Sequence, residues 1–164
     1  MQYSVTYSER QCKNFFEGMR WFLGGFLACI LAGAAMSIQG VMNTRLGEHI
    51  GTLKANAFVQ CTAAVLSLLV LLFWHTGSFA ALSAAPKYSW FGGVLALAIT
   101  VTVMLGMGRL GPTLAVAVIL IAQLSAAAAI DAFGIMGTEK LAFGWGKWAG
   151  LALMTGGMLL FKMK

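Results

Sequence analysis

The segment AMSIQGVMNTRLG (Ala35–Gly47) closes an uncharged run that begins at Trp21. No Lys, Arg, Asp or Glu occurs between Trp21 and Thr44. A helix needs about 20 such residues to cross the hydrocarbon of a bilayer, so the run predicts a membrane-spanning helix over residues 21–43. Polar side chains within a span are costly in lipid and therefore mark a candidate functional region. Here they are Ser37, Gln39 and Asn43.

The same pattern recurs along the rest of the chain. Of its 164 residues, 60% are hydrophobic and 10% are charged, whereas soluble domains carry about 25% charged residues. Three further uncharged runs are long enough to span, and a shorter fifth run can span if Lys147 and Lys162 reach the two interfaces. The sequence therefore predicts an all-α membrane protein in which a polar leader (1–20) precedes a five-helix transmembrane domain (21–164). The five helices are expected at 21–43, 55–74, 89–108, 112–133 and 145–163.

Short connections join the predicted helices. Thr52 is the expected N-cap of the second helix, and Pro112 lies where a first-turn proline is tolerated. Small residues four apart predict helix contacts, because they allow two backbones to approach closely. Such ridges are centred on Gly33 in the first helix, Gly92 in the third and Gly150 in the fifth.

The basic residues are balanced between the two membrane sides. An odd number of spans places the termini on opposite sides of the membrane. The lysines and arginines then divide almost equally between the two sides. Of the 11 Lys and Arg, the N-terminal side holds six: Arg10, Lys13, Arg20, Lys87, Lys140 and Lys147. The other side holds five: Arg45, Lys54, Arg109, Lys162 and Lys164. The positive-inside rule needs an imbalance to choose an orientation. Either an unseen cue fixes one orientation, or copies insert both ways and pair antiparallel.

The tryptophans favour the antiparallel pair. All five Trp residues map to the N-terminal side, whereas interfacial aromatic belts normally ring both faces of a membrane protein. Two antiparallel copies would restore one belt on each face. The net charge of +6 is explained by lysines and arginines in loops, so no nucleic-acid partner is expected.

Carboxamides supply the candidate binding groups. Gln39 and Asn43 are four apart on one helix face, and Asn56 and Gln60 repeat this spacing after the short loop. These four are expected to line an entrance, with interhelical hydrogen bonding as the alternative role for Asn43, Asn56 and Gln60. Gln123 lies near the middle of the fourth span, where its donors and acceptors suit an uncharged or zwitterionic ligand.

Ionisable residues give few other candidates. Asp131, at the end of the fourth predicted helix, is the one carboxylate near a span. It is a weaker candidate, for coupling transport to proton flow, and its alternative role is that of a helix-end group. His49 and His75 fall on opposite sides, and no Ser-His-Asp set or phosphate loop is visible. No enzymatic activity, cofactor or metal is expected.

The polar landmarks, taken in order, resemble those of a known family. They lie in LAGAAMSIQGVMNTRLGEHIGTLKANAFV (31–59), RLGPTLAVAVILIAQLSAAAAIDAFGIMG (109–137) and GLALMTGGMLLF (150–161). The chain is similar to the half-size, five-helix YdcZ-type members of the drug/metabolite transporter superfamily. One departure is Ala122-Gln123, where the family usually has Gly-Gln.

The resemblance implies a fold and a function class. Larger members of the superfamily have ten helices in two inverted repeats around a central cavity, and half-size members look like one repeat that pairs antiparallel. It implies a small-molecule transporter of the bacterial inner (plasma) membrane, working by alternating access as a dual-topology homodimer. Two alternatives stay open: a flippase of lipid-linked substrates, which the ten Met residues would suit, and a non-transporting membrane partner of another protein.

Overall fold

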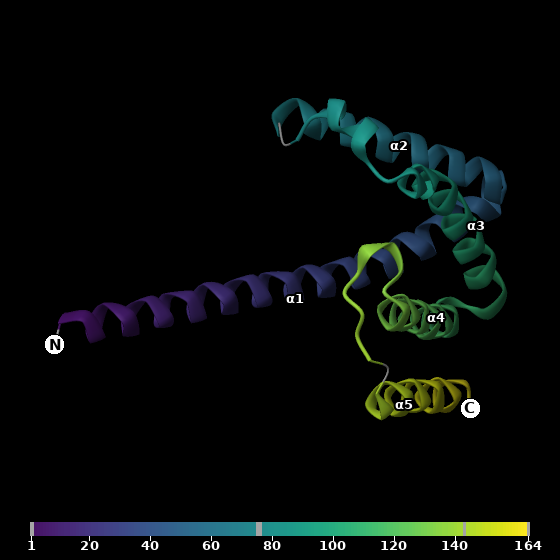
Figure 1. Cartoon of the computed structure of the whole chain (residues 1–164). Coiled ribbons are helices and arrows are strands. Elements are labelled where there is room, and N and C mark those ends of the chain that lie inside the picture. The colour runs from purple at the N-terminus through teal and green to yellow at the C-terminus, as the bar shows by residue number, and fades with distance from the viewer. Residues whose placement is uncertain (1, 75–76, 143, 164) are drawn as a thin grey trace. The chain divides into compact units, whose positions relative to one another are not determined.

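The computed structural model describes the backbone of residues 2–74, 77–142 and 144–163, with side chains from Glu17 onward. These ranges contain α-helices and short 3-10 helices but no strand (Figure 1). The all-α class is therefore confirmed, and its cause is that backbone groups in lipid must find their hydrogen bonds within their own segment. The α-helices are α1 (Gln2–Ile50), α2 (Thr52–Phe73), α3 (Gly92–Leu110), α4 (Pro112–Phe133) and α5 (Trp145–Lys162).

The last four helices lie close to their predicted positions. α4 begins at Pro112 and ends at Phe133, as predicted, with the proline in its first turn. α5 begins at Trp145, also as predicted. Two 3-10 helices, η1 (Phe79–Ala84) and η2 (Lys87–Phe91), occupy the connection before α3, and a third, η3 (Ile135–Gly137), follows α4.

The predicted end of the first helix was wrong. α1 continues beyond residue 43 to Ile50, and α2 begins after a single residue, Gly51. Gly51 also occupies the N-cap of α2 without a side-chain cap bond, so Thr52 is the first helical residue and not the predicted cap. The physical reason is that glycine at φ 88°, ψ 142° reverses the chain in one residue, which leaves the polar segment around it free to stay helical.

The chain divides into two compact units, Met1–Gln39 and Gly40–Lys164. The first unit is the N-terminal part of α1. In the second unit α2 contacts α3, α3 contacts α4, and α4 contacts α5, so helices adjacent in sequence are also neighbours in space (Figure 1). The C-terminal part of α1 belongs to this second unit and packs against α3.

Glycines make that contact between α1 and α3 close. A Cβ built on Gly40 would lie 2.5 Å from Cε of Met107, and one built on Gly47 would lie 2.7 Å from Cε of Met104. Both methionines are buried. The polar segment Ala35–Gly47 therefore provides the surface on which α3 packs, and Gly40 supplies room for the close approach.

The central glycines of the small-residue ridges have open space around them. A Cβ built on Gly33, Gly92 or Gly150 would meet no atom within 4 Å. The helix contacts expected at these ridges therefore stay a prediction. Spacing alone identifies a smooth helix face, and the partner of that face depends on how the helices are arranged.

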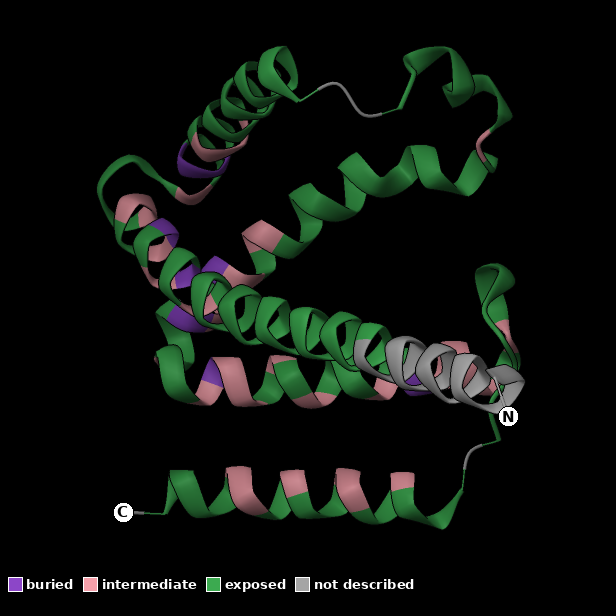
Figure 2. Cartoon of the chain, turned by 90° about the vertical axis from the view of Figure 1, so that its left-hand side faces the viewer, coloured by how far each residue is buried: buried purple, intermediate pink, exposed green. Residues whose placement is uncertain are grey.

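Four helices within the described ranges are long and apolar enough to cross a membrane, from Glu17–Ile50 to Pro112–Phe133. α5 is a helix, but lysines near both ends lower its mean hydropathy, so a fifth crossing stays a prediction. At most 11% of any of the four spans is buried within the chain, and Figure 2 shows mostly exposed residues along α2 and α3 and a mixture of exposed and half-buried residues along α4. Their apolar surface must therefore be covered by lipid or by another protein chain.

Candidate functional site

The two predicted asparagines are buried on either side of the Gly51 turn. Asn43 on α1 is 7% exposed and Asn56 on α2 is 3% exposed. Ala55, beside Asn56, is fully buried, and Met104 and Met107 of α3 bury the facing part of α1. The structure thus brings both predicted asparagines into a helix junction formed by the end of α1, the start of α2 and the end of α3.

Asn56 has an unusual feature in this junction. Its Oδ1 atom is buried and has no hydrogen-bond partner among the described residues. Burying a carbonyl oxygen without a partner costs about 1–3 kcal/mol. Such an oxygen is available to accept a hydrogen bond from a group that the single chain does not contain.

The three predicted glutamines have different environments. Gln60 is half-buried on α2, one turn beyond Asn56. Gln39 is exposed and belongs to the first unit, so the structure does not place it with Asn43 in one site. Gln123 is exposed on α4, and its carboxamide makes no hydrogen bond to any described residue.

A cavity of about 380 Å³ lies between α4 and α5. Asp131 and Lys147 lie at one end of it, because α4 finishes where the antiparallel α5 begins. Leu124 on α4 and Met154 on α5 lie toward the other end. Ala128, which lies on α4 between the two ends of the cavity, is buried. The volume falls within the range of small-molecule sites, about 300–1,000 Å³.

The segment after α4 shapes the charged end of this cavity. Gly134 ends α4 in the left-handed conformation, at φ 64° and ψ 36°, and its N–H donates to Ile130 O. The chain then returns, so that the Leu141 N–H donates to Asp131 O at 2.9 Å. The Tyr88 hydroxyl donates to Met136 O at 3.3 Å and connects η2 to the same segment. These bonds hold the connection against the end of α4, beside the Asp131 side chain.

A smaller cavity, about 240 Å³, lies where α1, α3 and the start of α4 meet. Arg45 and Glu48 are among its lining residues and form an ion pair at 3.0 Å. Both side chains of the pair are more than half exposed, so it contributes little stability. The pair marks the polar end of α1 rather than a buried charge site.

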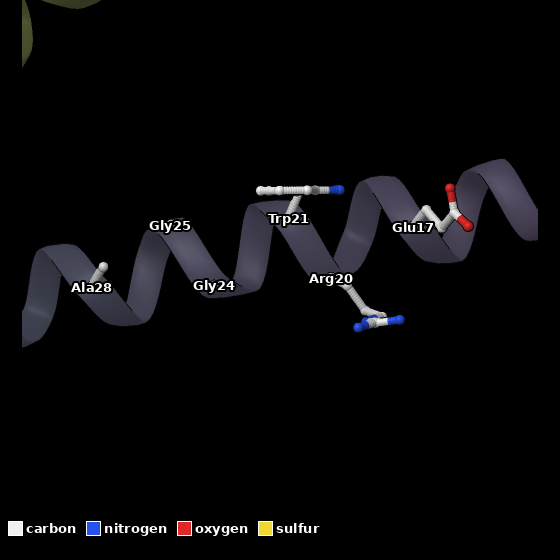
Figure 3. A pocket seen from close by; sticks show the side chains of 6 residues that line it. All are labelled: Glu17, Arg20, Trp21, Gly24, Gly25 and Ala28. Atoms are coloured by element: carbon white, nitrogen blue, oxygen red, sulfur yellow. The ribbon is translucent and has the colours of Figure 1, made fainter. Parts of the chain in front are cut away.

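A shallow groove also follows α1 within the first unit. Figure 3 shows that its lining residues come from successive turns of this one helix, with Arg20 and Trp21 extending in different directions. Glycines at 24 and 25 create the depression. It is a helix face and not an enclosed site, so it contributes no candidate chemistry.

Comparison with known families decides the class of the protein. The family model described as "Putative inner membrane exporter, YdcZ" matches residues 24–160, which is most of the chain. The chain belongs to the YdcZ family. No curated protein and no solved structure gives a match. As a YdcZ-family chain with apolar spanning helices, the protein is a multi-pass inner membrane transporter.

Two glycines within the segments that resemble the YdcZ family have clear structural roles. Gly47 accepts Met104 at the contact between α1 and α3, and Gly134 provides the left-handed residue that ends α4. Sequence reasoning missed Lys147 as a cavity residue, because it was interpreted as an interfacial anchor. The missed signal was topology: the end of one helix and the start of the next antiparallel helix lie on the same membrane side.

Proposed function

We propose that this YdcZ-family chain exports a small molecule by alternating access, as an antiparallel homodimer with a substrate cavity at the membrane midplane between the two copies. In this proposal α5 is a fifth crossing, and each copy supplies one inverted repeat. Inverted repeats commonly hold substrate near the midplane at the interface between the repeats. Gln123 contributes directly to the cavity, and Gln39, Asn43, Asn56 and Gln60 line its entrances.

The observation that carries the proposal is the exposure of Gln123. It lies in the middle of α4, one of the four spans, and its carboxamide has no partner among the described residues. An exposed carboxamide at this depth would face hydrocarbon in a single chain, which is unfavourable. A polar substrate in a cavity enclosed by the second copy would provide the missing hydrogen-bond partners.

The low burial of the spans supports the second copy. Since at most 11% of each of the four spans is buried in the chain, large apolar faces remain for contact with another subunit. The small-residue ridges at Gly33 and Gly92 are open and smooth, which suits helix contacts across a dimer interface. Balanced basic residues allow the two copies to insert in opposite orientations.

The test compares cells that produce the wild-type chain, Gln123→Ala or Ser125→Ala. Ser125 is the matched control, because it lies on α4 near Gln123 and its hydroxyl donates to Ile121 O within the helix at 2.8 Å. Mass spectrometry of the external medium measures which small molecules each strain releases. We expect a compound released by the wild type and by Ser125→Ala, but not by Gln123→Ala.

The released compound is then loaded into proteoliposomes that contain each purified variant. Efflux from Gln123→Ala vesicles at the wild-type rate would contradict the role of Gln123. Crosslinking of Gln123→Ala in the same vesicles should give wild-type dimer yields, because the substitution removes a cavity group and not an interface. Purification of the wild type only in association with a different protein would instead favour a non-transporting role.

A further inference from the structure

The charged end of the α4–α5 cavity has the composition of a headgroup site. Asp131 supplies a half-buried carboxylate, and Lys147 supplies a cation whose Nζ atom is removed from solvent. Both line the same cavity at matched ends of antiparallel helices. The two signs together complement a zwitterion whose cationic and anionic groups lie close to each other.

The rest of the cavity is apolar and runs toward the membrane interior. From Asp131 to Leu124 and from Lys147 to Met154, each helix advances by about 10 Å, since an α-helix rises 1.5 Å per residue. Along this length the lining consists of Leu, Ala, Gly and Met residues. A ligand that follows the cavity would therefore place a polar head at the helix ends and an apolar chain between the helices.

The rim of the cavity favours a lipid over a water-soluble ligand. Leu153 lines the cavity and is 77% exposed, and Leu124 at its inner end is 44% exposed. Exposed leucines on spanning helices face hydrocarbon, so the cavity opens sideways toward the bilayer. The charged pair lies at the ends of the helices, which is the depth of phospholipid headgroups.

We infer that the α4–α5 cavity binds a zwitterionic membrane phospholipid with a primary ammonium, such as phosphatidylethanolamine. The ammonium donates hydrogen bonds to the Asp131 carboxylate, Lys147 contacts the phosphate, and one acyl chain lies along Leu124, Leu151 and Met154. The bound lipid covers the apolar surface between α4 and α5. This inference rests on the α5 crossing of the proposed function, but it is independent of the transport step, because it concerns a cavity that does not include Gln123.

The test uses the purified full-length chain in detergent with phosphatidylethanolamine, phosphatidylcholine or phosphatidylglycerol of identical acyl chains. Native mass spectrometry measures the affinity for each lipid. We expect phosphatidylethanolamine to bind most tightly, because its ammonium donates hydrogen bonds, whereas phosphatidylcholine cannot donate and phosphatidylglycerol lacks the cation. Asp131→Asn should weaken phosphatidylethanolamine binding about tenfold and leave phosphatidylglycerol unchanged. Lys147→Gln should weaken both.

Matched controls separate this site from general charge effects. Glu139→Gln and Lys140→Gln make the same charge changes in the exposed connection between α4 and α5, and they should leave every affinity at the wild-type value. Equal losses in these controls would overturn the inference. So would soluble phosphoethanolamine that binds as tightly as the lipid, because the acyl chain would then contribute nothing.

A second pair of variants keeps all charges in place. Gly150 lines the cavity and a Cβ there meets no atom within 4 Å, so Gly150→Leu has room and fills the cavity. Gly146→Leu is its control, one turn earlier on α5, equally open and outside the cavity lining. We expect lipid binding to be lost in Gly150→Leu and retained in Gly146→Leu. Retention in both would show that lipid binds elsewhere.

Discussion

At the residue scale, most buried positions among the described residues lie at one junction of helix ends. The junction at the ends of α1 and α3 contains the close contacts of Gly40 with Met107 and of Gly47 with Met104. Apolar side chains gain little free energy when they exchange contacts with lipid for contacts with another helix, because lipid tails are equally apolar. Helix association in a membrane therefore depends on close packing of this kind. Single substitutions at the junction should therefore have larger effects than substitutions elsewhere on the same helices.

Gly40→Ala should lower the stability of the chain. The new Cβ would lie 2.5 Å from Cε and 2.8 Å from Sδ of Met107, a side chain that is only 4% exposed and has little room to move. We expect a loss of about 1–3 kcal/mol, measured as a lower midpoint of thermal unfolding in detergent. Gly106→Ala is the control, because nothing lies within 4 Å of its Cβ position. Equal midpoints for Gly40→Ala and wild type would contradict the contact.

Asn56→Leu should separate stability from transport. Removing a buried oxygen without a partner relieves an unfavourable burial, so the folded state should be unchanged or more stable by about 1 kcal/mol. Efflux in proteoliposomes should fall if the oxygen accepts a hydrogen bond from substrate at the cavity entrance. Asn56→Asp, which places a charge in the same position, should lower the unfolding midpoint. A large destabilisation by Asn56→Leu would show that the oxygen has a structural partner in the dimer.

At the element scale, two single glycines reverse the chain between helices. Gly51 joins α1 to α2 and Gly111 joins α3 to α4, with φ 88°, ψ 142° and φ 78°, ψ 160° respectively. Residues with a Cβ rarely adopt these angles, and forcing one to do so costs about 1–3 kcal/mol. Each turn brings the start of one helix next to the end of the previous one, and the Gly51 turn thereby places Asn43 and Asn56 near the same junction.

Gly51→Ala and Gly111→Ala should each destabilise the chain by about 1–3 kcal/mol, because alanine is strained at positive φ. Gly93→Ala provides the control, since Gly93 is a helical glycine without a positive φ and with open space around it. Thermal unfolding midpoints in detergent measure the three variants. A midpoint for Gly51→Ala that matches Gly93→Ala would show that the turn relaxes without strain.

At the scale of the whole molecule, the proposed antiparallel dimer requires that the charge difference across the membrane does not fix one orientation. With five crossings, six basic residues lie on one side and five on the other, so removing two from the C-terminal side or three from the N-terminal side should fix a single orientation in each case. Arg45→Gln with Lys54→Gln leaves six against three. Arg20→Gln, Lys87→Gln and Lys140→Gln together leave three against five.

We expect each substituted chain to lose transport when produced alone and to recover it when both are produced together, because an antiparallel pair needs one copy in each orientation. A cysteine appended after residue 164, in a chain whose native cysteines are replaced, reports orientation by labelling from each side of the membrane. The wild type should label from both sides and each variant from one. Labelling of the wild type from one side only would contradict the antiparallel dimer.

The sequence by itself determined the helices and the class of protein. Uncharged runs located α2 to α5 closely, because a spanning segment in lipid must satisfy its backbone internally and must exclude charge over a set length. It also identified the polar residues that a spanning helix would not carry without a reason. Its error at the end of α1 arose because a polar segment can stay helical when one glycine makes the turn.

Only the tertiary structure decided which of those polar residues are buried and which other residues lie beside them. It buried Asn43 and Asn56, left Gln39 and Gln123 exposed, and brought Asp131 and Lys147 to one cavity. Sequence could not decide this, because helices that are apolar on every face carry no periodic signal that distinguishes a neighbouring helix from lipid. Which faces meet depends on the shape of the packed surfaces, and in this chain glycines and methionines far apart in sequence supply that shape.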